Sequence, residues 1–195
     1  MSDPLLPVDD GQTPLTHEER EGLMPSYVTL RSELNEAEQA NILEAQEWAH
    51  ARKRDVLNQR FLNNLHKRMF GNVWKWAGKF RTSVKNIGVD AYKIATELQQ
   101  LINDVQYWSE NNTYEPDEIA ARFHHRLVYI HPYPNGNGRH ARLAAELLLR
   151  SMDQAPFSWG RKSLTDASKT REQYTTALRE ADNHDYAPLL KFVRS

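Results

Sequence analysis

The chain has 195 residues, of which 25 are Lys or Arg and 26 are Asp or Glu, so its formal net charge is −1. That length supports one well-buried core and is marginal for two, which predicts a single domain with appendages. The balanced charge argues against a protein that coats DNA or an anionic membrane, and no direct nucleic-acid binding is expected. The absence of cysteine excludes disulfide frameworks, thiolate zinc sites, iron–sulfur clusters and a cysteine nucleophile.

The first 30 residues combine prolines, glycines and acidic residues. This composition predicts an extended N-terminal arm (1–30) ahead of one domain (31–195). The arm has no basic stretch followed by an apolar one, so it does not resemble a secretion signal. The longest apolar tract, residues 143–149, is interrupted by Glu146 and is too short to span a bilayer. We therefore expect a soluble, cytoplasmic protein that does not associate with membranes.

Apolar residues at three- and four-residue spacing predict helices along most of the domain. We expect them over about 34–54 and 56–71, from residue 96, and over about 117–130, 138–152, 168–180 and 186–193. The 138–152 helix is the most apolar and should be the central one. Between Trp74 and Ile94, two glycines flank β-branched and aromatic residues of alternating polarity, which predicts a β-hairpin. The expected fold class is all-α, a helical bundle with one small β-hairpin.

The segment that joins the two best-defined helices is residues 131–142, HPYPNGNGRHAR, which we call the signature segment. Its two prolines end the incoming helix, because each lacks an N–H and restrains the residue before it. Gly136 and Gly138 permit positive φ and a close approach to the backbone. Because the next helix begins at once, its free amides should converge on one point and form an anion site.

Three side chains of the signature segment fit phosphate chemistry. Arg139 and Arg142 are three residues apart, so both can donate to phosphate oxygens from the first helical turns. His131, at the opposite lip of the loop, can accept a proton from an attacking hydroxyl. The alternative is an ordinary helix connector with a histidine and two solvated arginines nearby. Two glycines, two asparagines, two arginines and a histidine within twelve positions exceed what a connector needs.

HPYPNGNGRHAR resembles the signature of the Fic-domain (Fic/DOC) family, and WAGKFRTSVKNIGV resembles that family's hairpin. The resemblance covers about residues 40–193, and the whole chain is similar to the subfamily called mobile mystery protein B. It implies a Fic-fold helical bundle with a β-hairpin flap. It also implies transfer of AMP from ATP to a Ser, Thr or Tyr hydroxyl of another protein, and a helix-turn-helix companion protein.

The resemblance further implies roles for individual residues. His131 would be the general base that activates the target hydroxyl. Tyr133 replaces the usual Phe and keeps a ring in the loop. The nucleotide phosphates would be held by Gly136, Asn137, Gly138, Arg139 and Arg142. The flap would dock an extended segment of the target through Lys79, Ile87, Gly88 and Val89, although a hairpin that only covers the core is an equal alternative.

Asn135 stands where the family has a metal-binding Asp or Glu. Mg²⁺ prefers carboxylate or phosphate oxygens, and asparagine offers only a neutral carbonyl, so Asn135 is a weak candidate ligand. We therefore expect AMP transfer that is slow or needs high Mg²⁺. The alternatives are removal of AMP, transfer of a phosphate group from another donor, or a non-catalytic nucleotide-binding regulatory module. A zinc site is not expected, because His124 and His125 are adjacent and no HExxH spacing exists.

Fic proteins are often restrained by a helix with the motif Ser/Thr-x-x-x-Glu-Gly/Asn, whose glutamate pairs with the second signature arginine. Residues 32–37, SELNEA, fit this pattern loosely. Glu36 would then be a regulatory residue that pairs with Arg142, with Ser32 at the first motif position. The alternative is that Ser32 is a helix N-cap and that Glu36 is a capping-box residue or a solvated charge.

Overall fold

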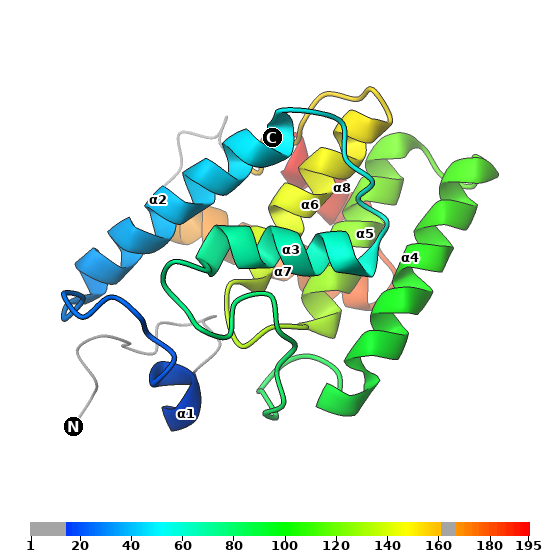
Figure 1. Ribbon diagram of the computed structural model, residues 1–195. Coiled ribbons are helices and arrows are strands. Elements are labelled where there is room, and N and C mark those ends of the chain that lie inside the picture. Colours follow the sequence, from blue (N-terminus) through cyan, green and yellow to red (C-terminus); the bar gives the residue numbers. More distant parts are fainter. Residues whose placement is uncertain (1–14, 161–166) are drawn as a thin grey trace.

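The computed structural model describes residues 15–160 and 167–195, so most of the first half of the predicted arm (1–14) lies outside the described residues. Within these ranges the chain is helical, and the predicted all-α bundle is confirmed (Figure 1). Helix ends fall within a few residues of the expected ones. The helices are α1 (His17–Arg20), α2 (Arg31–His50), α3 (Gln59–Phe70), a 3-10 turn η1 (Ala91–Lys93), α4 (Ile94–Glu110), α5 (Pro116–Ile130), α6 (Asn137–Ser151), α7 (Ala167–Asp182) and α8 (Ala187–Val193).

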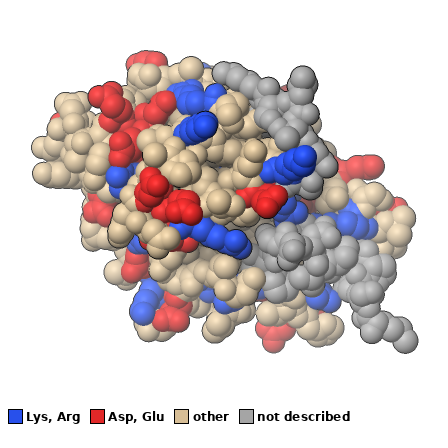
Figure 2. All heavy atoms as spheres, turned by 180° about the vertical axis from the view of Figure 1, so that it is seen from behind, with Lys and Arg blue, Asp and Glu red and all other residues tan. Residues whose placement is uncertain are grey.

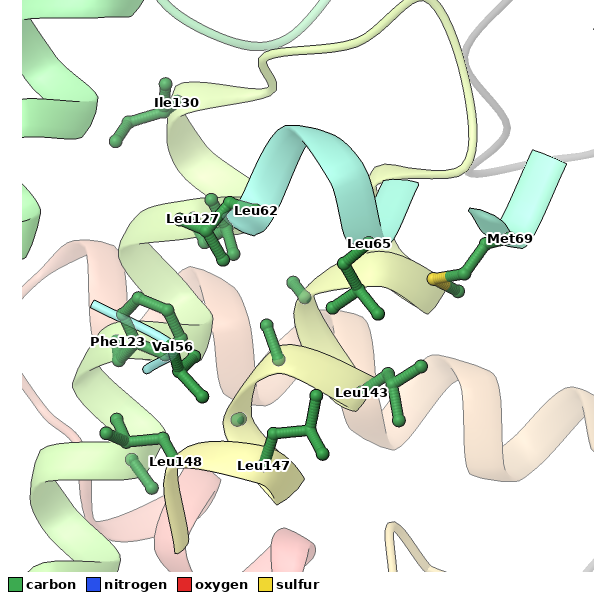
Figure 3. Close-up of a cluster of buried hydrophobic side chains, with 14 of the residues drawn as sticks. Val56, Leu62, Leu65, Met69, Phe123, Leu127, Ile130, Leu143, Leu147 and Leu148 are labelled. Carbon is green, nitrogen blue, oxygen red and sulfur yellow. The ribbon is translucent and has the colours of Figure 1, made fainter. Parts of the chain in front are cut away.

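Helix α6 is the central helix, as its apolar composition predicted. It packs against α2, α3 and α5 and lies in the middle of the bundle in Figure 1. Three alanines, Ala141, Ala144 and Ala145, are fully buried and let the neighbouring helices approach closely. Figure 3 shows the leucines of α6 meeting apolar side chains of α3 and α5. This packing fixes the position of the α6 N-terminus, where the signature segment enters the helix.

Helix α3 packs against α2, α4 and α6, and Figure 3 shows its apolar side chains facing α6. Leu62, Leu65 and Met69 are at most 1% exposed, whereas Phe61 is only half-buried. The same helix carries a fully buried histidine, His66, beneath the signature segment. Helix α3 is therefore both a wall of the core and a support for the loop above it.

The second half of the predicted arm is packed rather than extended. Thr16 caps α1, since its hydroxyl accepts from the Glu19 amide (3.3 Å) and its own amide donates to the Glu19 carboxylate (2.8 Å). Leu15 is buried. Backbone hydrogen bonds join residues 22–24 to residues 73–75. The composition of the arm did not reveal the bonds to residues 73–75, because these partners lie about fifty residues away in the sequence.

The predicted β-hairpin is wrong. Residues 74–90, all of them described, form turns and no strand. Trp74 makes only an isolated bridge with Leu23. Two backbone carbonyls of this segment, those of Ser83 and Val89, accept hydrogen bonds from the buried Arg81 guanidinium. A carbonyl that a side chain satisfies needs no partner in a facing strand. We keep the name flap for residues 79–90.

The surface carries both signs of charge. Figure 2 shows acidic and basic side chains intermixed on the back face, in keeping with the net charge of −1. Among the described parts of the chain, no helix has the length and apolar character to cross a bilayer.

Candidate active site

The signature segment forms a tight turn between α5 and α6. His131 caps the end of α5 in a left-handed conformation (φ 54°, ψ 59°). Gly136 precedes the first residue of α6 with a φ of 78°. The first amides of α6 have no partner within the helix, so they and the positive end of the helix dipole face the loop. The turn therefore brings the start of α6 to the loop, and the anion site there stays a prediction.

Glycine is required at one position of this turn and leaves space at another. A Cβ atom on Gly136 would lie 2.6 Å from ring carbons of Phe70, and its positive φ disfavours other residues as well. A Cβ atom on Gly138 would meet no atom within 4 Å. Gly136 thus packs the turn against α3, whereas Gly138 borders open space that a ligand can enter.

Asn137 acts on the loop rather than offering its side chain to a ligand. Its Oδ1 accepts from the Tyr133 amide (2.9 Å), and its Nδ2 donates to the Tyr133 carbonyl (2.8 Å). The residue is 3% exposed. The sequence-based expectation that Asn137 holds phosphate is therefore narrowed to its backbone amide, because both side-chain groups already close the turn.

Tyr133 anchors the loop in the core, as its aromatic character predicted. Its ring is fully buried and stacks on His66, with centroids 3.7 Å apart. Its hydroxyl donates to Asn63 Oδ1 (2.9 Å). Burial raises the pKa of the Tyr133 hydroxyl, so the group stays neutral.

His66 is a support that sequence reasoning missed. Its Nδ1 accepts from the Gly78 amide (3.0 Å), which assigns the proton to Nε2, and Nε2 lies 3.0 Å from the Asn135 carbonyl. Burial holds the pKa of His66 well below its usual range, with the nearby His140 as a second cause. A neutral His66 therefore ties the start of the flap segment to the signature segment. Its place on the buried side of α3 was the only sequence signal.

His131 is 5% exposed and is held as a neutral base. Burial lowers the pKa of its imidazole to about 4, with the Arg81 and Lys85 charges acting in the same direction and a hydrogen bond with the Val128 backbone opposing them. A neutral imidazole can accept a proton at physiological pH. The flap approaches this residue closely, since a Cβ atom on Gly88 would lie 2.6 Å from the Cβ of His131.

Arg81 fastens the flap to the signature segment and was also missed from the sequence. Its Nε donates to the His131 carbonyl (2.7 Å), Nη1 to the Ser83 carbonyl (2.9 Å), and Nη2 to the Val89 carbonyl. The Arg81 amide donates to the Pro132 carbonyl (2.9 Å). One buried guanidinium thus satisfies carbonyls from both segments, which sets the position of the flap beside His131.

We expect Arg81→Lys to lower the free energy of unfolding by about 2–4 kcal/mol, because an ammonium cannot reach carbonyls in several directions and leaves some buried without donors. Hydrogen exchange should accelerate selectively at the Arg81 and Val89 amides. Urea unfolding and exchange mass spectrometry measure both effects. Arg60→Lys, at an exposed position of α3, is the matched control. An Arg81→Lys variant with wild-type stability would contradict this account.

The two signature arginines lie against different neighbours. Arg139 Nη1 pairs with Glu38 of α2 (2.6 Å). The Arg142 guanidinium carbon lies 4.5 Å from the centre of the Tyr174 ring on α7 and 5.7 Å from that of Trp159. Both arginines start from the first two turns of α6, but they reach toward opposite flanks of it.

The structure does not bring Glu36 to Arg142, which corrects the expected inhibitory pair. Glu36 is exposed, whereas Glu38 on the other side of α2 is 6% exposed and faces the site. Two residues along a helix turn the side chain by about 200°, so only one of the two can face inward. Ser32 is not the N-cap either: Leu30 holds that position, and the Glu33 carboxylate accepts its amide (2.9 Å).

The donors at the loop fit a magnesium ion poorly. Asn135 Oδ1 already accepts from the Gly136 amide (2.6 Å), and no carboxylate belongs to the signature segment. Within residues 15–160 and 167–195 no group of three metal-ligating side chains occurs. His124 and His125 serve structure instead: His124 Nε2 lies 2.9 Å from the Tyr174 hydroxyl, and His125 Nε2 lies 2.8 Å from Asp182.

A hollow of about 690 Å³ lies on the other side of α3 and is not the candidate site. No residue of the signature segment lines it. Its link to the loop is Asn63, which lines the hollow and accepts the Tyr133 hydroxyl. Its walls carry the cations Arg52, Lys53, Arg54, Arg60 and Lys67.

Comparison with known proteins agrees with this architecture. Residues 56–149 match the model of the Fic/DOC family. The protein adenylyltransferase Fic of Aedes aegypti is 28% identical over 145 residues, which cover 72% of this chain and 28% of that protein. The protein adenylyltransferase fic-1 of Caenorhabditis briggsae is 32% identical over 134 residues, 66% of this chain and 25% of that protein. The crystal structure of BepC from Bartonella tribocorum with bound AMPPNP superposes with a TM-score of 0.66 at 19% identity, over 92% of this chain and 97% of BepC.

The shared architecture is a helical domain in which one loop ends α5 and begins α6. The chain contains a region of the Fic/DOC family, residues 56–149. It spans about a quarter of the length of the curated relatives it matches, 28% and 25% for the two described above.

Proposed function

We propose that this domain transfers AMP from ATP to a Ser, Thr or Tyr hydroxyl of a target protein. The observation that carries the proposal is the pairing, within one turn, of the neutral, buried His131 with the free amides that begin α6. A base beside an anion cradle is what an acceptor hydroxyl and a nucleotide need. The names of the two curated relatives, both protein adenylyltransferases, support the same reaction.

In the proposed reaction the target hydroxyl attacks the α-phosphorus of ATP and gives its proton to His131. The bond from that phosphorus to the bridging oxygen breaks, and pyrophosphate leaves. The amides of Asn137 and Gly138 would hold the phosphates, and the Gly136 amide would join them by exchanging its hydrogen bond with Asn135 Oδ1 for one with the ligand. Arg139 and Arg142 would offset the charge that develops as pyrophosphate departs, which is the electrostatic part of such transfers.

We propose that the flap docks the target. Val84 and Ile87 are 85% and 47% exposed, so the flap presents apolar side chains next to His131. Lys79 and Gly88 are exposed as well, and Val89 is half-buried. An extended target segment could pair with the flap backbone and place its hydroxyl near the base.

We also propose that the chain is one Fic domain over 31–195 with an N-terminal arm (1–30), of the mobile mystery protein B subfamily. The support is the similarity of the sequence to that subfamily, including the arm. A helix-turn-helix companion would then be its partner. Copurification of the coexpressed pair tests this part of the proposal.

One observation favours a second candidate, transfer of a phosphate group from another donor. The signature segment has no carboxylate, so the metal-assisted route to AMP is weakened. ATP labelled at the α-phosphorus tests AMP transfer, which attaches the label to protein. Transfer from a donor other than ATP attaches no label from ATP, and a phosphate-containing adduct in the mass spectrum separates it from a binding module, which modifies nothing.

We expect Asn135→Asp to lower the Mg²⁺ concentration for half-maximal AMP transfer roughly tenfold, equal to about 1.4 kcal/mol of added binding free energy. An aspartate can keep the bond from the Gly136 amide and add a second, charged oxygen for the ion. Calorimetry with Mg²⁺ and a non-hydrolysable ATP analogue measures the affinity apart from activity. Asn112→Asp, before the other end of α5, adds the same charge as a control. Unchanged Mg²⁺ affinity in Asn135→Asp would show that the missing acid is unimportant.

A further inference from the structure

Glu38 is a buried acid beside the signature segment that no part of the proposed reaction uses. It lies on the inner face of α2 and is 6% exposed. A buried carboxylate is stable only when its charge is paired and its oxygens are bonded. Both conditions hold, because Oε2 lies 2.6 Å from Arg139 Nη1 and Oε1 accepts from the Trp74 indole N–H (2.7 Å).

Arg139 is held on a second side by an aromatic ring. Its guanidinium carbon lies 4.8 Å from the centre of the Phe70 ring. The same ring packs beneath Gly136 at the start of the predicted anion site. The Arg139 side chain is nevertheless 41% exposed, so a ligand can reach it. Glu38 and Phe70 therefore fix the guanidinium next to the predicted anion site without enclosing it.

We propose that Glu38 is a positioning residue that holds Arg139 in the orientation in which it binds a nucleotide phosphate. This inference rests on the proposed function of the signature segment. An arginine side chain loses considerable rotamer freedom when it binds a ligand, and a group already ordered in the free protein loses less on binding. The Trp74 indole in turn fixes Glu38. Trp74 therefore holds Glu38, and Glu38 holds Arg139.

The opposite role would be a brake, in which Glu38 competes with phosphate for Arg139. A brake must release the arginine for activity, and this would leave a buried carboxylate without its ion pair. Positioning requires no such step, because the guanidinium has further N–H groups for phosphate while Nη1 stays on Glu38. The two roles predict changes of opposite sign when the carboxylate is neutralised.

The test is a double-mutant cycle with Glu38→Gln, Arg139→Ala and the double variant, in the full chain. ATP affinity is measured by calorimetry, and kcat and KM for ATP are measured in the labelled-ATP assay. We expect Glu38→Gln to lower kcat/KM about 10–100-fold, the range seen when a supporting shell around functional groups is removed. The double variant should be no worse than Arg139→Ala, because Glu38 acts only through Arg139.

Glu36→Gln is the matched control, because it removes the same charge from the exposed face of the same helix. It should leave ATP affinity and transfer unchanged. Trp74→Phe supplies an independent variant: it removes the indole donor to Glu38, keeps an aromatic ring and should weaken ATP binding severalfold in the same direction. Circular dichroism and thermal unfolding verify that each variant is folded.

Tighter ATP binding or faster transfer in Glu38→Gln would establish the brake and overturn the proposal. Losses that add in the double variant would show a general structural role and overturn it as well. The double-mutant cycle in ATP affinity can be measured without any AMP transfer. It therefore tests the positioning of Arg139 by Glu38 separately from the proposed AMP transfer. A wild-type protein that binds ATP but moves no AMP contradicts the proposed function, while the affinity cycle still decides the role of Glu38.

Discussion

His131→Ala should reduce AMP transfer by about 10²–10⁴-fold, the contribution typical of a positioned general base. ATP affinity should change little, because the phosphate contacts proposed here come from the α6 amides and the two arginines. The free protein already holds the His131 imidazole neutral, since burial lowers its pKa to about 4. The base therefore needs no prior deprotonation at neutral pH. Initial rates with α-labelled ATP and calorimetry with an unreactive analogue measure the two quantities.

A matched control is His184→Asn. His184 is exposed in the turn between α7 and α8, and asparagine tolerates its left-handed backbone (φ 67°). This variant should transfer AMP at the wild-type rate. Retention of most activity in His131→Ala would remove His131 from the role of base. A large loss of ATP affinity would instead assign it to nucleotide binding.

Acid should unfold this protein at an unusually high pH, because four of its buried histidines, His66, His124, His131 and His140, have a pKa far below the usual value. Burial lowers the pKa of His124 to about 3 and of His131 and His140 to about 4, and holds that of His66 well below its usual range. In the unfolded chain each has an ordinary pKa of about 6.5. Above that pH both states are neutral and stability is complete. As pH falls below it, only the unfolded chain gains protons, so the free energy of unfolding decreases.

With four such groups, the free energy of unfolding can fall by about 5 kcal/mol per pH unit below roughly pH 5.5. A fall over one or two pH units then exceeds the free energy of unfolding of a typical domain. Urea unfolding at several pH values between 7 and 5 measures the slope. His140→Gln keeps a donor for the Leu62 carbonyl, which His140 Nε2 contacts at 3.0 Å, and removes one titrating group. The slope should then fall by about 1.4 kcal/mol per pH unit. Stability that does not change between pH 7 and 5 would contradict the account.

This acid sensitivity also bears on activity. The His131 base titrates at about pH 4, below the range in which the fold should survive. The transfer rate of the wild type should therefore decline in acid together with the folded fraction, rather than along the titration curve of one histidine.

Local patterns were enough to predict the helices and the candidate loop. The apolar spacing of α6 identified the central helix, and the glycines of the signature segment predicted the turn that the structure describes at the start of α6. Both features depend on residues close together in sequence. The hairpin was wrong because alternating polarity does not reveal a partner such as Arg81, whose guanidinium bonds carbonyls up to fifty residues away.

The missed supports share one property: their function depends on contacts between distant segments. His66 and Glu38 lie 69 and 101 residues from their partners in the signature segment. In the sequence, Glu36 and Glu38 are both acids in an amphipathic helix. Only the packing of α2 on α6 shows that Glu38 faces inward and that Glu36 faces solvent.

The most direct test of the central claim is peptide mass spectrometry of protein incubated with ATP, with release of pyrophosphate measured in the same reaction. The account predicts the mass of one AMP group on a Ser, Thr or Tyr hydroxyl, one pyrophosphate per adduct, and no adduct in His131→Ala. A phosphate-sized adduct, or an AMP group found on His131 itself, would contradict the claim that His131 serves as a base for AMP transfer.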